Sequence, residues 1–207
     1  MLINDKLLPV GKLRESASAK YRANLIIFTK CPPKLQPIEQ RIIKNKLDIR
    51  PYQDLFFTTI VYGEITPSEK GFALFSNDMR KYTVLLVTGI GNPEPLVDYL
   101  KPQVGEIIHC TFPDHYAFKP SDLDEINKKY IAIGQSEKMI ITTEKDLVRL
   151  KSVKIIPEHF FREVYYIPIE IKFLDKKRDL FNQRILNYVT ENRSNSKISQ
   201  RKNGVHR

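Results

Sequence analysis

One uninterrupted apolar run that leads into a glycine turn constrains the fold of this chain more than any other feature. The run covers residues 83–88 (TVLLVT) and contains no charged residue, which is typical of a strand that is covered on both faces. The turn at residues 89–93 (GIGNP) follows at once, and a helical pattern covers residues 94–100. A buried strand that passes through a tight turn into a helix is the unit from which parallel α/β sheets are built.

The same alternation of strand and helix patterns extends over most of the chain. Ser121, with Asp124 three residues on, is the predicted N-cap of one helix. Strands that alternate with helices predict an α/β fold in which a mostly parallel sheet, joined by right-handed crossovers, is flanked by helices. Further strands are predicted at residues 24–29, 55–62, 106–111, 138–142 and 164–171, and further helices at residues 37–47, 120–133, 144–150 and 175–190.

Length and charge predict one domain with a basic tail. The chain has 207 residues, which is typical of one domain or of one domain with a small appendage. Its net charge is +10, and residues 191–207 hold five of the basic residues and one acid. We therefore expect an α/β domain over residues 24–190 and a disordered basic tail over residues 191–207. The basic body favours an anionic partner such as phosphate, nucleic acid or an acidic lipid surface.

The sequence shows no signal for secretion or for a membrane span. No apolar run reaches the length of about 18 residues that a spanning helix needs, and the first residues include Asp5 and no apolar stretch of a signal peptide. Cys31 and Cys110 are too few for a disulfide framework, which indicates a reducing compartment. No spacing of His, Cys and carboxylates predicts a metal site built from this chain alone.

Three segments that follow predicted strands are candidates for a ligand site, because ligands of α/β sheets bind beyond the carboxyl ends of the strands. In the first segment, Gly91 and Asn92 lie in a turn whose backbone N–H groups either approach an anion or simply form a tight bend. The third glycine of a dinucleotide fingerprint is absent. The motif G-x-x-x-x-G-K-[ST] does not occur in the sequence, so this chain alone holds no phosphate cradle of the P-loop type.

The second segment places an acid beside an imidazole. Asp114 and His115 lie together in the loop FPDHYAF at residues 112–118. A histidine in such a loop is a candidate general base, since the ordinary pKa of the side chain is about 6.5. The alternative is that Asp114 caps the turn while His115 packs on Tyr116 or Phe118.

The third segment combines a hydroxyl, two acids and a lysine at a predicted helix start. Thr143, Glu144 and Asp146 are residue types that cap helices, and Lys145 between the acids either meets a phosphate or neutralises its neighbours.

Near the start of the chain, Arg14 is followed by Glu15. A guanidinium group suits phosphate binding, but this pair on its own carries little information.

Four segments occur in the order and approximate spacing of one protein family. They are LLPVGKLRE at residues 7–15, GIGNP at 89–93, FPDHY at 112–116 and TEKD at 143–146. The chain resembles the C-terminal part of the tetraacyldisaccharide 4'-kinases, enzymes of the lipid A pathway, over residues 5–150. It departs from the family pattern at Ser16, where Pro is frequent, at Tyr116, where His is frequent, and at Arg149, which stands for Lys.

The resemblance implies a Rossmann-like fold, related to the C-terminal lobe of P-loop kinases, and a lipid A biosynthesis activity. The implied reaction transfers the γ-phosphate of ATP to the 4'-hydroxyl of tetraacyldisaccharide 1-phosphate and uses Mg²⁺. In the family, a P-loop half with the metal-binding acids precedes the loop at residues 7–15. The resemblance therefore implies that residues 1–23 continue from a missing N-terminal domain. That domain would bind most of the ATP and Mg²⁺, and this chain alone would be inactive.

The resemblance also implies roles for individual residues. His115, with Asp114 beside it, is implied to be the catalytic histidine, forming a dyad with an aspartate of the missing half that orients and deprotonates the sugar hydroxyl. Arg14 and Glu15 are implied to meet substrate and phosphate. The residues implied to line the nucleotide side are Gly91, Asn92, Glu144, Lys145 and Asp146.

The implied partners are the lipid A disaccharide precursor, the missing P-loop domain and anionic phospholipid at the cytoplasmic face of a Gram-negative inner membrane. Nucleic acid is not an expected partner.

Two other classes of protein stay open from the residues alone. One is a non-catalytic basic α/β module that binds nucleotide or RNA, although the chain lacks an RNP-type stacking signature. The other is a structural lobe that needs its other half to fold.

Overall fold

The chain divides into two compact units. The computed structural model describes residues 10–11, 13–69, 78–154 and 160–203. Unit 1 comprises residues 1–61 and 171–207, and unit 2 comprises residues 62–170, so that unit 2 is inserted in the sequence of unit 1. The predicted boundaries 1–23, 24–190 and 191–207 do not mark this division, because both of its boundaries fall inside or at the end of single strands.

A five-stranded sheet forms the centre of unit 2, in the order β3-β7-β6-β4-β5. Strand β4 pairs in parallel with both β5 and β6, and β6 pairs in parallel with β7. The short strand β3 is antiparallel to β7. Every residue of β4 is buried, as its uninterrupted apolar run predicts. The strands are β3 (Thr66–Pro67), β4 (Thr83–Thr88), β5 (Glu106–Thr111), β6 (Lys138–Thr143) and β7 (Val164–Ile167).

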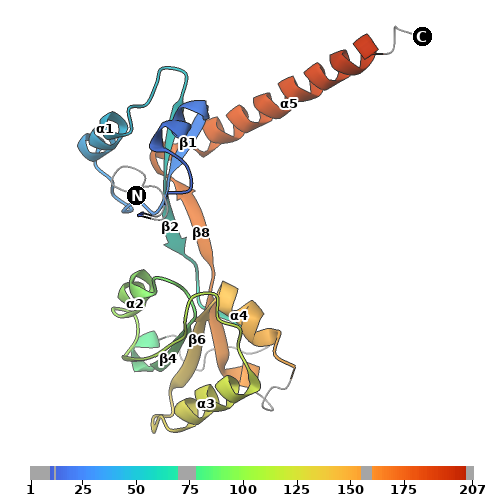
Figure 1. Cartoon of the computed structure of the whole chain (residues 1–207). Helices are drawn as coiled ribbons and strands as arrows, with labels where there is room; N and C mark the ends of the chain where they lie inside the picture. Colours follow the sequence, from blue (N-terminus) through green and yellow to red (C-terminus); the bar gives the residue numbers. More distant parts are fainter. Residues whose placement is uncertain (1–9, 12, 70–77, 155–159, 204–207) are drawn as a thin grey trace. The chain divides into compact units, whose positions relative to one another are not determined.

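Helices cover both faces of this sheet. Helix α2 (Glu94–Leu100) packs on one face, while α3 (Pro120–Ile131) and α4 (Glu144–Lys151) pack on the other (Figure 1). Short 3-10 helices lie at Met79–Lys81 (η2) and Phe160–Glu163 (η3). The predicted α/β fold with a mostly parallel sheet flanked by helices is thus confirmed. Alternate residues of β4 point to opposite faces, so Val84 and Leu86 join the α2 side while Leu85 and Val87 join the other.

Helix α3 begins one residue before the predicted cap. Pro120 is its first residue and Lys119 is its N-cap, and the backbone N–H of Lys119 donates to Asp122 Oδ2 at 2.7 Å. The prediction of Ser121 as the N-cap is therefore wrong. Proline at the first helical position, where no N–H is needed, fixes the helix start.

Unit 1 is built on a three-stranded sheet in the order β1-β2-β8. Strand β1 pairs in parallel with β2. Phe56 of β2 packs edge-to-face against Phe173 and Phe181, with ring centroids 6.0 and 5.3 Å away. The elements are η1 (Ala17–Arg22), β1 (Leu25–Phe28), α1 (Pro37–Lys46), β2 (Asp54–Tyr62), β8 (Ile169–Phe173), η4 (Leu174–Lys176) and α5 (Arg178–Asn203).

The last predicted strand and helix differ from the observed ones. The strand predicted over 164–171 is two strands, β7 and β8, because Pro168 between them has no N–H to donate to a ladder. Helix α5 starts after Asp175 and Lys176, whose backbone φ values of 56° and 54° are not helical. It continues to Asn203 through most of the predicted disordered tail, a stretch without Pro or Gly. Residues 204–207 lie outside the described part.

Candidate functional site

The three candidate segments meet at one edge of the sheet of unit 2. Thr88 at the end of β4 is in register with Thr111 at the end of β5, and Val87 is in register with Thr142 of β6. From β4 the chain passes to α2 on one face, and from the neighbouring β6 it passes to α4 on the other face. Adjacent strands whose connections diverge in this way form the switch point at which α/β sheets bind ligands.

Asp146 is the buried centre of this edge, with a side-chain exposure of 0%. Its Oδ2 accepts hydrogen bonds from the backbone N–H of Gly89 at 2.9 Å and from the Thr143 hydroxyl at 2.8 Å. Thr143 is also the N-cap of α4, because its Oγ1 accepts the backbone N–H of Asp146 at 3.1 Å. The capping interpretation of Thr143 and Asp146 therefore agrees with the geometry, and the carboxylate of Asp146 is engaged by protein donors.

Arg149 extends the network from Asp146 to the histidine loop. Its Nη1 donates to Asp146 Oδ1 at 3.0 Å and to the backbone carbonyl of Gly89 at 3.1 Å. Its Nη2 lies 3.3 Å from His115 Nδ1. The sequence singles out Arg149 only as a departure from the family's Lys. The available signal was its place three residues after Asp146 on one helix face.

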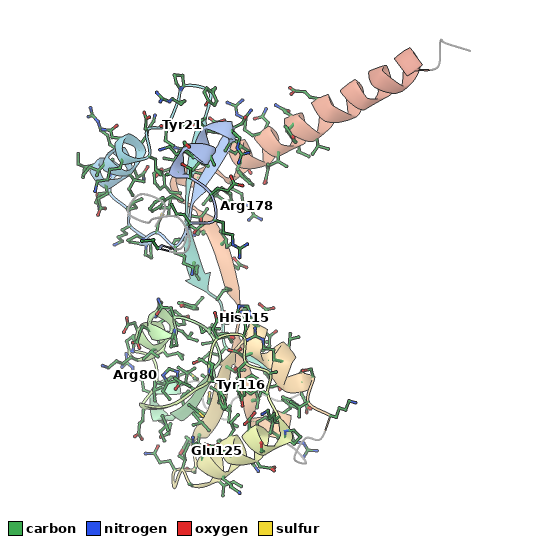
Figure 2. All side chains as sticks on the ribbon, viewed as in Figure 1. Tyr21, Arg80, His115, Tyr116, Glu125 and Arg178 are labelled. Atoms are coloured by element: carbon green, nitrogen blue, oxygen red, sulfur yellow. The ribbon has the colours of Figure 1, made fainter. Side chains whose placement is uncertain are left out.

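His115 lies at the surface of this edge, with a side-chain exposure of 74%. Figure 2 shows it at the end of unit 2 opposite Glu125 of α3. Its backbone φ of 61° is in the left-handed region, and its backbone N–H donates to Asp114 Oδ1 at 2.9 Å. The alternative in which the imidazole is packed away does not hold. Phe112, Tyr116 and Phe118 pack on one another instead, with ring centroids 5.0 to 5.5 Å apart.

Asp114 lies among an ammonium group, an imidazole and a glycine turn. Its Oδ1 lies 3.7 Å from Lys145 Nζ, and its Oδ2 lies 3.7 Å from His115 Nε2. A Cβ atom on Gly91 would lie 3.1 Å from Asp114 Oδ2, so a side chain at this position would require Asp114 to shift. Asn92 and Glu144 are exposed at the same edge. This edge therefore presents an imidazole and an ammonium group around one half-exposed carboxylate.

Comparison with known proteins identifies the family. A family model described as tetraacyldisaccharide-1-P 4'-kinase matches residues 1–190. The chain belongs to this family. Curated relatives of that name include one from Phocaeicola vulgatus, 38% identical over 96% of this chain and 55% of its own length, and one from Flavobacterium johnsoniae, 39% identical over 91% and 52%. The chain thus spans about half the length of the curated relatives it matches.

One solved structure is similar in fold to this chain. It is a crystal structure described as the "apo" form of LpxK from Aquifex aeolicus in complex with ATP. The sequence identity is 20%, the TM-score is 0.50, and the match covers 86% of this chain and 47% of the other. This likeness supports the α/β architecture.

The arginine loop of the family pattern lies in the other unit. Arg14 and Glu15 are exposed residues of unit 1, and Glu15 forms an ion pair with Arg22 of η1. The remaining predicted site residues all belong to unit 2. Leu7, Leu8, Pro9 and Lys12 of the same loop lie outside the described residues.

The described residues contain no group of three or more His, Cys, Asp or Glu side chains that could hold a metal ion. Asp114 Oδ2 lies 3.7 Å from His115 Nε2, whereas both carboxylate oxygens of Asp146 accept hydrogen bonds from protein donors. Among the residues that the structure describes, no helix has the length and apolar character that crossing a bilayer requires.

Proposed function

We propose that this chain is the part of a tetraacyldisaccharide 4'-kinase that supplies the histidine of the active site. In the assembled enzyme, the γ-phosphate of ATP is transferred to the 4'-hydroxyl of tetraacyldisaccharide 1-phosphate. The observation that carries the proposal is that His115 is exposed at the switch point of the sheet and contacts Arg149 of the buried network. The chain that holds it belongs to this family.

The proposed reaction needs little covalent chemistry from the protein. The 4'-oxygen attacks the γ-phosphorus, the bond from that phosphorus to the bridging oxygen of ADP breaks, and the hydroxyl proton passes to a base. Catalysis then depends on positioning and on electrostatic stabilisation. We assign His115 to a dyad with an aspartate outside this chain, which orients and deprotonates the hydroxyl.

The other predicted residues have supporting roles in this proposal. Gly91, Asn92, Glu144 and Lys145 lie at the edge of the sheet with His115 and would face the nucleotide, whereas the buried Asp146 would act by holding that edge together. We assign Arg14 and Glu15 of unit 1 to substrate and phosphate.

In this proposal, the phosphate cradle and the metal site belong to another part of the enzyme. The sequence contains no G-x-x-x-x-G-K-[ST] motif, and the described residues offer no cluster fit for a metal ion. We therefore assign the binding of Mg²⁺ and of the triphosphate to the part of the family's chain that this one does not span. Without that part, positioning is lost and turnover should be undetectable.

Unit 1 offers a surface on which that part would dock. Both large core clusters lie in unit 2, whereas α1 has no buried residue and β8 is exposed or half-buried throughout. Strand β1 is an edge of its sheet in the described structure, open to pairing with a further strand. Contiguous exposed apolar side chains mark interaction sites. Exposed large apolar side chains of unit 1 include Ile27, Ile38, Ile42, Ile171, Leu186 and Tyr188.

The proposed location is the cytoplasmic face of the inner membrane. A net charge of +10 would favour contact with anionic phospholipid, where the acylated substrate resides. Binding to vesicles with and without anionic lipid would report this attraction, which should weaken at high salt.

Transfer of labelled phosphate tests the proposed function. The chain alone is compared with a chimera in which the part of the Phocaeicola vulgatus relative that lies outside the match is joined to it. The intact relative is the positive control. We expect no product from the chain alone and product from the chimera. Product from the chain alone, or a folded chimera without activity, would overturn the proposal.

A further inference from the structure

We infer that Arg149 is the positioning residue of His115, and that it holds the neutral imidazole in the tautomer that carries its proton on Nε2. The inference concerns the structure of this chain, and only its catalytic consequence rests on the proposed function. It starts from the 3.3 Å separation between Arg149 Nη2 and His115 Nδ1.

The direction of this hydrogen bond follows from the chemistry of arginine. A guanidinium group has five N–H donors, has no acceptor, and keeps its charge at all accessible pH values. Nδ1 of His115 must therefore be the acceptor and cannot carry a proton while the bond exists. The proton of the neutral ring is then on Nε2, the atom 3.7 Å from Asp114 Oδ2.

Arg149 is itself held rigidly. Its side chain is 20% exposed and forms an ion pair with the fully buried Asp146, and Nη1 also donates to the carbonyl of Gly89. Asp146 in turn accepts the N–H of Gly89 and the hydroxyl of Thr143. A planar guanidinium fixed through one nitrogen leaves the other nitrogen at a defined position.

The loop holds the imidazole from its backbone side. The left-handed φ of His115 is stabilised by its N–H bond to Asp114 and by the bond from Tyr116 N–H to the Pro113 carbonyl at 3.2 Å. Left-handed backbone at a non-glycine residue persists only where its surroundings enforce it. In the proposed kinase, His115 thus presents a fixed Nε2–H donor that orients the dyad, and the hydroxyl proton passes to the aspartate of that dyad.

Long-range ¹H–¹⁵N NMR spectra of the full, ¹⁵N-labelled chain at about pH 8.5, where histidine is neutral, test this inference. His115→Asn assigns the signals, because asparagine tolerates left-handed backbone. Arg149→Lys keeps a cation for Asp146 but lacks the second nitrogen. Lys151→Met removes a charge from the same helix at a residue that contacts Ser68 instead. Circular dichroism melting shows whether each variant is folded.

We expect only the Nε2–H tautomer for His115 in the native chain and in Lys151→Met. We expect both tautomers, with a shifted Nδ1 resonance, in Arg149→Lys. Unchanged His115 signals in a folded Arg149→Lys, or a proton on Nδ1 in the native chain, would overturn the inference. Failure of the chimera to transfer phosphate would instead overturn the proposed function and leave this result standing.

Discussion

The carboxylate of Asp146 accepts the backbone N–H of Gly89 at 2.9 Å, although the two residues are 57 positions apart in the chain. This bond joins the end of β4 to the first turn of α4. Because Arg149 forms an ion pair with the same carboxylate, the geometry of the histidine loop depends on a residue that is completely buried.

Replacing Asp146 should strongly destabilise unit 2. Asp146→Ala leaves the guanidinium of Arg149 and the N–H of Gly89 without their partner, and breaking a buried ion pair costs about 3–5 kcal/mol. Urea unfolding followed by circular dichroism measures the change. Asp124→Asn, on the exposed surface of α3, is the matched control and should alter the free energy of unfolding by less than about 0.5 kcal/mol. Equal effects of the two substitutions would argue against the network.

Adding a methyl group to the glycine turn should affect activity more than stability. A Cβ on Gly91 would press on Asp114 Oδ2 from 3.1 Å, whereas a Cβ on Gly134 would meet nothing within 4 Å. In the active chimera, Gly91→Ala should lower the rate of phosphate transfer by roughly tenfold to a hundredfold, because small displacements at a reacting centre have large effects. Gly134→Ala should leave the rate unchanged. A normal rate for Gly91→Ala would show that neither Asp114 nor the glycine turn takes part in the reaction.

Stability should fall at high pH because of buried tyrosines. Burial raises the pKa of Tyr62, Tyr130 and Tyr165, and for Tyr130 the hydrogen bond to Glu163 raises the pKa further. The unfolded chain ionises these phenols near pH 10, while the folded chain keeps them neutral. Their contribution is therefore fully present below about pH 10 and is lost above it.

The variant Tyr130→Phe isolates the largest of these effects. Urea unfolding at pH 8 and pH 10.5 should show a smaller loss of stability on raising the pH for this variant than for the native chain. A loss of the same size in both would contradict a raised pKa for Tyr130.

Two buried thiols report on the two units separately. Burial raises the pKa of both Cys31 in unit 1 and Cys110 in unit 2. Both should therefore react slowly with a disulfide reagent at pH 8 compared with the unfolded chain. Variants with one cysteine replaced by alanine measure each rate.

Cys31 should be the faster of the two in the chain alone, on the order of tenfold, if the exposed face of unit 1 permits local opening. The chimera should slow the reaction of Cys31 and leave that of Cys110 unchanged. Equal reaction rates of Cys31 in the chain alone and in the chimera would contradict the assignment of unit 1 as the docking surface.

Elements whose pattern is local could be predicted from the sequence. The buried run of β4, the strand β5 and the helix α2 occur at the predicted residues, because their apolar periodicity and flanking glycines or prolines specify them without help from distant parts. The division into two units could not be predicted, since it passes through β2 and β8. The break at Pro168 is a local signal, and the prediction of one continuous strand missed it.

The segments that form the candidate site could be predicted from the sequence, but the contacts between their side chains could not. Strand ends in a parallel sheet must share an edge, so the three segments were expected together. The spacing of three residues indicates the pair of Asp146 and Arg149. The contacts of Arg149 with Gly89 and His115 depend instead on helix α4 docking beside the end of β4, which no spacing in the sequence encodes. Arg14 and Glu15 were grouped with these residues only by resemblance, and they lie in the other unit.

The most direct test of the central claim is the rate of phosphate transfer by the chimera with His115→Asn. Asparagine preserves the left-handed backbone of the loop while it removes the imidazole. We predict that the rate falls by about 10²–10⁴-fold with an unchanged melting temperature, the range expected when the dyad that removes the hydroxyl proton is broken. A rate within about threefold of that of the unsubstituted chimera would show that His115 is not the residue this chain contributes to the reaction.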